Sequence, residues 1–332
     1  MELDRSRVVS VAADAFRAHG ISDADAEQTA QVLVSADARG KHSHGLLRLP
    51  RFVRGIEHGN VDPAGEIEVV AERGGAATLS GGSRLGPVVA SAATGEVMDR
   101  ADEFGVGAVG VNDSNHLGML GYYTDQLQRE GYVGIAMTNT EPAMPPYGGV
   151  EPVLGTNPIA IGLPTDPVFN LDMSTSAIAR GTVLEKREAG ESIPEGVALD
   201  AEGEPTTDPE AALEGTILPF GGPKGSGLAI AVEVLAGGLV GAAMGEDVTG
   251  TYHTEDPCTK GDLFLAIDPA VLGSRGAVDR MSAFLRALKQ TETNATVEEI
   301  RLPGEHSVSR DRTRERIDVP ADLWEQVREL RE

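Results

Sequence analysis

The chain has 332 residues, 40% of them hydrophobic, and carries 52 acidic against 28 basic side chains, a formal net charge of −24. This length can bury a large core, and we expect one catalytic unit of interwoven lobes spanning residues 1–332. A charge so far below zero repels polyanions and argues against nucleic acid as a partner. The single cysteine, Cys258, excludes an internal disulfide and favours a cytoplasmic location.

The acidic N-terminus does not fit a signal peptide, and no stretch approaches the roughly 20 apolar residues of a membrane span. We therefore expect no membrane association. Acids spread over the whole chain favour solubility at high salt, so we interpret them as the surface of a halophilic protein. The most acidic segment, residues 188–215, is expected to lie on that surface.

Helices are predicted at residues 4–18 and 23–39 by their apolar spacing. The second follows Ser22 with an acid three residues later, the pattern of a capping box, and ends at a glycine. After a polar loop at 41–45, apolar residues at helical spacing predict a third helix with Pro50 in its first turn.

A short β segment is predicted at 66–79, a helix at 87–103 and a strand at 106–111. The stretch from Gly105 to Gly110 matches the G-x-G-x-x-G pattern of a Rossmann site. In such a site the glycines follow a strand and open a helix, whereas here the helix comes first. Gly105 is expected to end that helix, so no helix N-terminus faces a pyrophosphate. We predict that this stretch is not the cofactor site.

The rest of the chain continues to alternate between strands and helices, which indicates an α/β fold. A glycine-rich turn at 221–227 is expected to lead into one long apolar helix. Further strands are predicted at 132–140, 158–164, 169–175, 262–269 and 297–304, and further helices at 122–131, 277–290 and 321–332.

Two loops carry residues suited to chemistry on a hydroxy acid. His42 and His44 lie in the loop after the second helix, with Arg48 one helical turn beyond His44, and His116 lies in the turn that ends the 106–111 strand. A histidine there can exchange a proton with a hydroxyl or carbonyl. An arginine can hold a carboxylate through two parallel hydrogen bonds. The alternative, that both loops are only capped turns, stays open.

A metal site is a second alternative, since His42, His44, His116 and Asp113 could supply ligands and would make the protein a metal-dependent hydrolase. The spacing is unlike that of zinc sites, and we predict no metal. For phosphate, the 221–227 turn opens a helix and carries Lys224, which could add a positive charge beside backbone N–H groups.

These segments, in this order, resemble the malate/L-lactate dehydrogenase family of the second, non-Rossmann type. The matching pieces run from about residue 8 to 330 and include HSHGLLRLPRF, SNHLG, GTNPIAIGLP, LDMSTSAIARG, GGPKGSGLAIAVEVLAG and DLFLAIDP. The family also includes sulfolactate and ureidoglycolate dehydrogenases, diketogulonate reductase and cyclic-imine reductases. The resemblance implies a mixed-sheet, non-Rossmann nicotinamide-binding fold with N- and C-terminal helices.

The implied enzyme is an oxidoreductase that moves a hydride between NAD(P) and a 2-hydroxy or 2-keto acid. Malate/oxaloacetate or lactate/pyruvate-like substrates are expected first, with ureidoglycolate, a sugar keto acid or a cyclic imine as alternatives. By resemblance, His44 or His116 transfers the proton, Arg48 meets the substrate carboxylate, and Ser43 belongs to the same catalytic motif.

The implied cofactor is NAD or NADP, with NAD preferred, and the family is typically a homodimer. The cofactor contacts implied by the resemblance are Thr140, Asp172, Met173, Ser174, Thr175, Ser176, Lys224, Gly225, Gly304, Glu305 and His306.

One departure from the family is noted before the 262–269 strand. Lys260 and Asp262 stand where many members carry an amide or a histidine, so a substrate or cofactor contact is expected to differ there.

Three lobes are expected. They are a helical lobe (1–70 with about 295–332), a central lobe (about 71–120 with about 220–294) and a cofactor-binding lobe (about 121–219).

Overall fold

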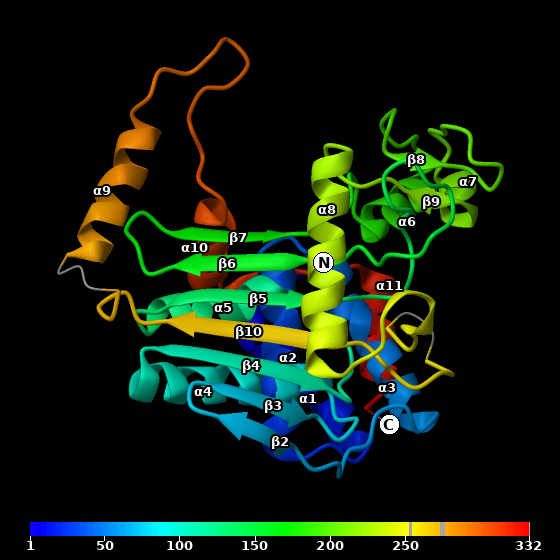
Figure 1. Cartoon of the computed structure of the whole chain (residues 1–332). Helices are drawn as coiled ribbons and strands as arrows, with labels where there is room; N and C mark the ends of the chain where they lie inside the picture. Colours follow the sequence, from blue (N-terminus) through cyan, green and yellow to red (C-terminus); the bar gives the residue numbers. More distant parts are fainter. Residues whose placement is uncertain (252–253, 273–275, 332) are drawn as a thin grey trace.

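The centre of the fold is one seven-stranded mixed sheet with the order β2-β3-β4-β10-β5-β6-β7 (Figure 1). The computed structural model describes residues 1–251, 254–272 and 276–331. Neighbouring strands run antiparallel except for the parallel pair β3–β4. This confirms the predicted α/β class with a mixed sheet. The strands are β2 (Glu68–Arg73), β3 (Ala76–Ser80), β4 (Val106–Asn112), β5 (Val133–Thr138), β6 (Ile159–Leu163), β7 (Phe169–Met173) and β10 (Asp262–Ile267).

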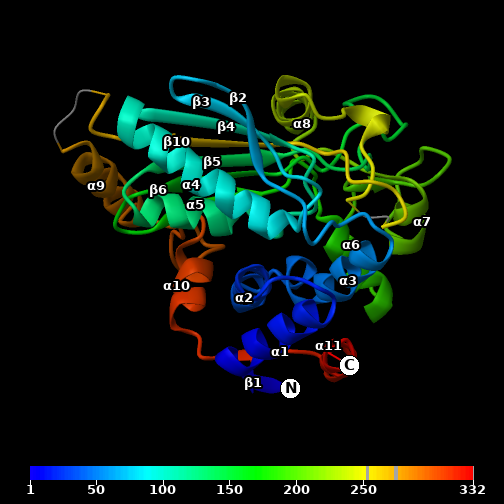
Figure 2. The same ribbon diagram turned by 90° about the horizontal axis from the view of Figure 1, so that it is seen from below.

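Helices cover both faces of the sheet, and further helices form a layer beneath them (Figure 2). On one face, α4 (Gly86–Phe104) and α5 (Leu120–Arg129) enclose a buried core with Val97, Val109 and Phe264. On the other lies α8 (Pro223–Val232). The layer beneath α4 and α5 consists of α1 (Arg5–Ala18), α2 (Asp23–Ala38), α3 (Leu49–Glu57) and α11 (Ala321–Glu329), which share a second core.

Local signals in the sequence account for several of these boundaries. The Ser22 hydroxyl accepts a hydrogen bond from the Asp25 N–H, which confirms the predicted cap of α2. The N-terminal strand β1 (Glu2–Asp4) pairs with β11 (Arg316–Asp318), so the two ends of the chain meet in one small sheet.

The glycines of the G-x-G-x-x-G stretch allow close packing. Gly105 ends α4 with φ of +81°, as predicted. A Cβ on Gly107 would lie 2.1 Å from the Val97 carbonyl oxygen of α4, and one on Gly110 would lie 2.6 Å from the Val240 side chain. Glycine at these two positions therefore lets helical segments approach β4 from both faces of the sheet.

A smaller lobe is built from residues between β7 and α8. It contains α6 (Arg180–Ala189), α7 (Pro209–Glu214) and the short pair β8 (Ala198–Leu199) and β9 (Thr216–Ile217) around its own apolar core. The acidic segment 188–215 runs through this lobe, and most of its acidic side chains are exposed.

Two predictions about elements need correction. Residues 66–79 form a hairpin, because the Gly74–Gly75 turn separates β2 from β3. Residues 297–304 form no strand. The Asn170 N–H donates to the Pro303 carbonyl at the sheet edge, and the segment then leads into α10 (Glu305–Thr313). The helix predicted at 277–290 is found as α9 (Ala277–Lys289) (Figure 1).

The predicted long apolar helix changes its winding after Val232. A π-helical turn at Glu233–Gly237 and a 3₁₀ turn at Gly238–Val240 follow α8. The continuous run Pro223–Val240 is nevertheless long and apolar enough to cross a membrane by length and composition, and 44% of it is buried in the molecule. The expectation that no segment has these properties was wrong.

Candidate active site

The loop after α2 is organised by one buried carboxylate. Asp37 accepts a hydrogen bond from the Leu46 N–H at 2.8 Å through Oδ2, and its Oδ1 lies 2.9 Å from His42 Nδ1. This bond to Asp37 raises the pKa of His42. A Cβ on Gly45 would lie 2.2 Å from Asp37 Oδ1, so only glycine fits between the carboxylate and the loop. Asp37 therefore holds the loop at its first histidine, His42, and at Leu46, where the loop ends.

His44 and Arg48 are linked through Ser43. Arg48 Nε donates to the Ser43 carbonyl at 2.7 Å, and the Ser43 hydroxyl lies 3.0 Å from His44 Nδ1. A hydroxyl can donate or accept, so this contact suits either tautomer of the His44 ring. The ring centroids of His44 and His116 are 5.8 Å apart. The structure thus brings together the two histidines and the arginine that the sequence singled out.

His116 lies in the turn that follows β4, as predicted, and its ring packs edge-on to Phe52 with centroids 6.3 Å apart. The Gly118 N–H donates to His116 Nδ1 at 3.1 Å, so the neutral ring carries its proton on Nε2. The turn is tightly packed against α4, because a Cβ on Gly86 would lie 2.3 Å from the His116 carbonyl oxygen.

Both facing histidines are held neutral. Burial, followed by the nearby Arg48 charge, lowers the pKa of His44 from 6.5 to about 4. Burial and then Arg48 also lower the pKa of His116 well below its usual value. An anion bound beside Arg48 would offset its charge and raise both pKa values. The site is therefore arranged so that ligand charge and histidine protonation are coupled.

These side chains line one pocket of about 370 Å³. Apolar walls come from Leu117, Met119, Leu120, Pro158 and Met173. Eight of the residues named from the sequence line it: Ser43, His44, Arg48, His116, Thr140, Asp172, Met173 and Ser174. Gly304 lines a neighbouring cavity of about 200 Å³ that shares Lys41, Met119 and Asp172 with the first.

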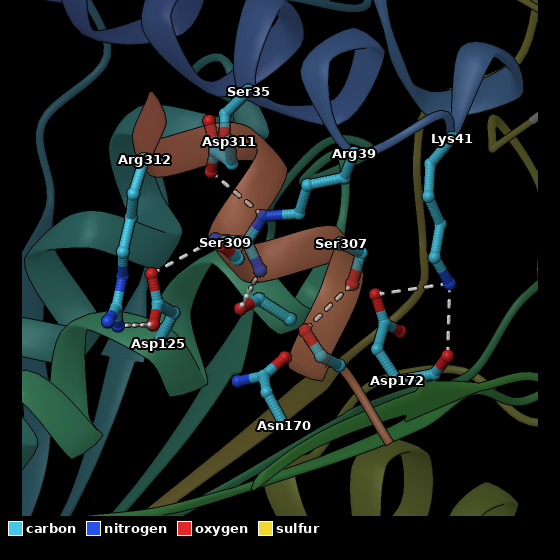
Figure 3. A network of polar contacts seen from close by, with 12 residues as sticks. Ser35, Arg39, Lys41, Asp125, Asn170, Asp172, Ser307, Ser309, Asp311 and Arg312 are labelled. Atoms are coloured by element: carbon cyan, nitrogen blue, oxygen red, sulfur yellow. Dashed lines mark hydrogen bonds and ion pairs between the residues drawn. The ribbon is translucent and has the colours of Figure 1, made fainter. Parts of the chain in front are cut away.

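Figure 3 shows how the α10 segment is joined to these elements by charged side chains. Lys41 donates to the Asp172 carbonyl at 3.0 Å and lies 3.5 Å from its carboxylate. Two residues earlier, the Arg39 guanidinium connects Asp311 of α10 with Asp125 of α5 through contacts of 2.9 and 3.0 Å. The end of α2 therefore fixes α5, α10 and the end of β7 together.

The remaining predicted cofactor residues lie outside the main pocket. Thr175 and Ser176 point into the protein, where Thr175 bonds the Thr156 carbonyl and Ser176 bonds the Ile178 carbonyl. Phe220, just before α8, donates its N–H to the Thr175 carbonyl and so brings the turn of Lys224 and Gly225 next to this strand end. Lys224 itself is exposed, Glu305 is paired with Lys289, and His306 lies 3.5 Å from Glu299.

Sequence reasoning did not assign several residues that line the pocket. They are Lys41, Glu141, Thr156, Arg180, Glu185, Thr251 and Lys260. Arg180 lies within the matching piece LDMSTSAIARG, four residues after Ser176, but was given no role. Lys260 stands at the departure from the family where a differing substrate or cofactor contact is expected.

Three of the four proposed metal ligands, His42, His44 and His116, line the pocket, but Asp113 does not. His42 is bound to Asp37, and Asp113 accepts hydrogen bonds from Ser80 and Ser83 outside the pocket. Across residues 1–251, 254–272 and 276–331, no group of three or more His, Cys, Asp or Glu side chains is arranged to hold a metal ion.

The sequence profile of the malate/L-lactate dehydrogenase family matches residues 3–328. The chain belongs to this family. It is 47% identical over 271 residues to the L-sulfolactate dehydrogenase of Methanothermobacter thermautotrophicus, covering 81% of this chain and 80% of the relative. It is 42% identical to the malate/(S)-sulfolactate dehydrogenase of Methanothermus fervidus, covering 99% of this chain and 96% of the relative.

Its fold matches the solved structure of the sulfolactate dehydrogenase from Methanocaldococcus jannaschii with a TM-score of 0.93, at 40% identity over 99% of this chain and 96% of that one. Two further relatives differ in the cofactor that their names state. One is the (2R)-3-sulfolactate dehydrogenase (NADP(+)) of Chromohalobacter salexigens, 37% identical over 96% of this chain and 95% of the relative. The other is the ureidoglycolate dehydrogenase (NAD(+)) of Escherichia coli, 32% identical over 92% and 89%. The protein is therefore an NAD(P)-dependent dehydrogenase of hydroxy acids.

Proposed function

We propose that this dehydrogenase oxidises and reduces carbon 2 of malate-, sulfolactate- or lactate-like acids. The observation that carries the proposal is the grouping of His44, His116 and Arg48 around one pocket. A 2-hydroxy acid needs a partner for its carboxylate and a base for its hydroxyl, and these three side chains supply both within one small volume. Ureidoglycolate, sugar keto acids and cyclic imines remain the alternative substrates.

The pocket fits a nicotinamide. Apolar side chains such as Leu117 and Met119 can flank the ring, and the hydroxyl-bearing Thr140 and Ser174 lie close enough to line the same space. NAD(P) supplies the hydride acceptor when it is bound. We propose NAD as the preferred form, because the net charge of −24 opposes an additional phosphate on the ribose.

Arg48 is proposed to hold the carboxylate on carbon 1. Its Nε is bonded to the Ser43 carbonyl, which fixes the guanidinium beside both imidazoles. The bound carboxylate places the neighbouring hydroxyl toward the histidines, and its charge raises their depressed pKa values. Binding of the substrate thereby prepares the site to accept a proton.

His44 is proposed as the proton-transfer residue, and His116 as the hydrogen-bond donor. His116 Nδ1 accepts a hydrogen bond from the Gly118 N–H. A second proton on the ring would have to sit on Nδ1, where its N–H would face the N–H of Gly118. His44 has no such conflict, since the Ser43 hydroxyl accepts as readily as it donates. His44 Nε2 can therefore take the substrate proton while Nδ1–H points to Ser43.

The test is the initial rate of NADH and NADPH oxidation with oxaloacetate, sulfopyruvate and pyruvate. His44→Asn should lower kcat by about 10²–10⁴-fold, the usual contribution of a positioned acid or base. Arg48→Gln should mainly raise KM, and His19→Asn, at the end of α1, serves as the control. Near-normal kcat in His44→Asn with a large loss in His116→Asn would reverse the two roles. No turnover of any keto acid would move the search to the imine, sugar-acid and ureidoglycolate alternatives.

We also propose that a second copy of this chain covers the outer face of α8 and the turns after it. Ile230, Val234 and Leu239 are 46%, 52% and 67% exposed on one continuous apolar segment, and such a surface usually marks an interface. A homodimer would explain why the run Pro223–Val240 is apolar yet half-uncovered. Leu239→Glu should shift the sedimentation coefficient from dimer to monomer, whereas binding of the wild type to lipid vesicles would argue for a membrane instead.

The single cysteine supports a cytoplasmic enzyme.

A further inference from the structure

Lys260 and Asp262 form an ion pair in the interior, at the start of β10. Their side chains are 2% and 1% exposed. Lys260 Nζ lies 2.7 and 2.6 Å from the two carboxylate oxygens of Asp262. Residues two apart on an extended segment share one face, which explains why the two side chains meet. Of the pair, Lys260 lines the pocket and Asp262 does not.

The stability of the sheet does not explain why these two positions are charged. The strand it opens is otherwise apolar, with Leu263, Phe264 and Ala266 buried. Moving two charges out of water is costly, and apolar residues of similar volume often serve a core equally well. A buried charge that is kept beside a pocket is therefore best explained by a ligand of opposite charge.

The topology places Lys260 among the catalytic elements. β10 runs antiparallel to β4 and β5, and Asp262 pairs with Val111 on one side and Thr138 on the other. The residues just before β10 therefore lie between the turn that carries His116 and the segment that leads to Thr140. Arg48 reaches the same pocket from the other side, on the loop after α2. The charges of Arg48 and Lys260 both lower the pKa of His116.

One donor of the lysine remains for the pocket. An ammonium group has three N–H bonds, and the two oxygens of Asp262 take at most two of them. The carboxylate behind the lysine offsets its desolvation and fixes its position. Arg48 and Lys260 thus line one volume of about 370 Å³, together with Lys41 and Arg180, in a chain of net charge −24. Of these, Lys41 already lies 3.5 Å from the carboxylate of Asp172.

We propose that Lys260 binds a second anionic group of the substrate, so that the enzyme selects 2-hydroxy acids with a carboxylate or sulfonate on carbon 3. This inference rests on the proposed function, in which Arg48 holds the carboxylate on carbon 1. A dianion can engage both Arg48 and Lys260, whereas lactate or pyruvate leaves the Lys260 donor facing a methyl group. We expect the monoanion to bind more weakly, because the buried N–H donor of Lys260 then has no acceptor on the substrate.

The experiment compares dianionic and monoanionic keto acids in matched variants. Lys260→Gln combined with Asp262→Asn removes both charges but keeps a hydrogen-bonding pair, so no lone buried charge is created. We expect kcat/KM for oxaloacetate and sulfopyruvate to fall about 10- to 100-fold, the size of a charge-assisted hydrogen bond, while pyruvate changes by less than about threefold. Lys186→Gln, on an exposed lysine of α6, is the control and should change neither.

Equal losses for all three keto acids would overturn the proposal and assign the pair a purely structural role. A binding measurement separates this test from the proposed function. With NADH present, tartronate (a dianion) should bind the wild type more tightly than oxamate (a monoanion), and the double variant should lose that preference. Retained preference in the double variant refutes the role of Lys260 even if no keto acid is turned over. Loss of the preference without any turnover supports the anion site and refutes only the reaction.

Discussion

Replacing Arg39 by alanine tests whether the buried charge network holds the N-terminal helices to α5 and α10. The Arg39 side chain is 3% exposed and makes three contacts, to Asp311 at 2.9 Å, to Asp125 at 3.0 Å and to the Gly121 carbonyl at 3.1 Å. Removing one partner of a buried ion pair commonly costs about 3–5 kcal/mol, because the remaining charge stays buried.

The remaining partners place the expected loss at the lower end of that range. Without Arg39, the Asp311 carboxylate still contacts Arg5 at 2.7 Å and the Ser35 hydroxyl. Asp125 likewise keeps Arg312 and Arg129. We therefore expect Arg39→Ala to lower the free energy of unfolding by about 3 kcal/mol.

The assay is urea unfolding followed by circular dichroism, with the m-value checked for a two-state transition. Arg328→Ala is the control, because Arg328 is 52% exposed and its partner Glu325 is 66% exposed, and such pairs contribute within about 1 kcal/mol. A loss below about 1 kcal/mol for Arg39→Ala, or equal losses in both variants, would refute the view that this network stabilises the fold.

Three further predictions concern the catalytic loop and the surface. The folded-state pKa of His44 is lowered from 6.5 to about 4, so the native state binds fewer protons than the unfolded chain between these values. Stability should fall as pH decreases through that window, and His44→Asn should flatten the slope; identical slopes would contradict the assigned burial. Gly45→Ala should displace Asp37 and lower kcat at least tenfold with little change in NADH affinity, measured by fluorescence titration; normal kcat would mean that the loop adapts. Stability measured against KCl should rise toward molar salt if the net charge of −24 reflects a halophilic surface, and a flat dependence would contradict that view.

The sequence was most informative where a feature depends on neighbouring residues. The cap at Ser22 and the left-handed Gly105 follow from local chemistry, and both are found where predicted. His44 and Arg48 were grouped for the same reason, since they are one turn apart in a short loop. His116 could be added because histidines at strand ends commonly face a ligand, and its ring is indeed 5.8 Å from that of His44.

Features that depend on distant segments were missed. Residues 297–304 have a strand-like pattern, but they meet the sheet edge through the bond from Asn170 to Pro303 and form no strand. The turn at Glu233–Gly237 widens where the Glu233 carboxylate accepts bonds from Asn139 and Asn157, which lie 94 and 76 residues earlier in the chain. The link from Lys260 to the pocket likewise depends on strand order, which no local pattern encodes.

The position of β10 has a consequence for how the protein forms. This strand lies between β4 and β5, although it follows β5 by more than a hundred residues in the chain. During synthesis both neighbours expose unpaired edges until residues 262–267 emerge, and such edges are prone to aggregate. Because many contacts of this sheet are distant in sequence, folding should be slow for a protein of this size. Lys260 arrives with the same strand, so the step that closes the sheet also completes the wall of the pocket.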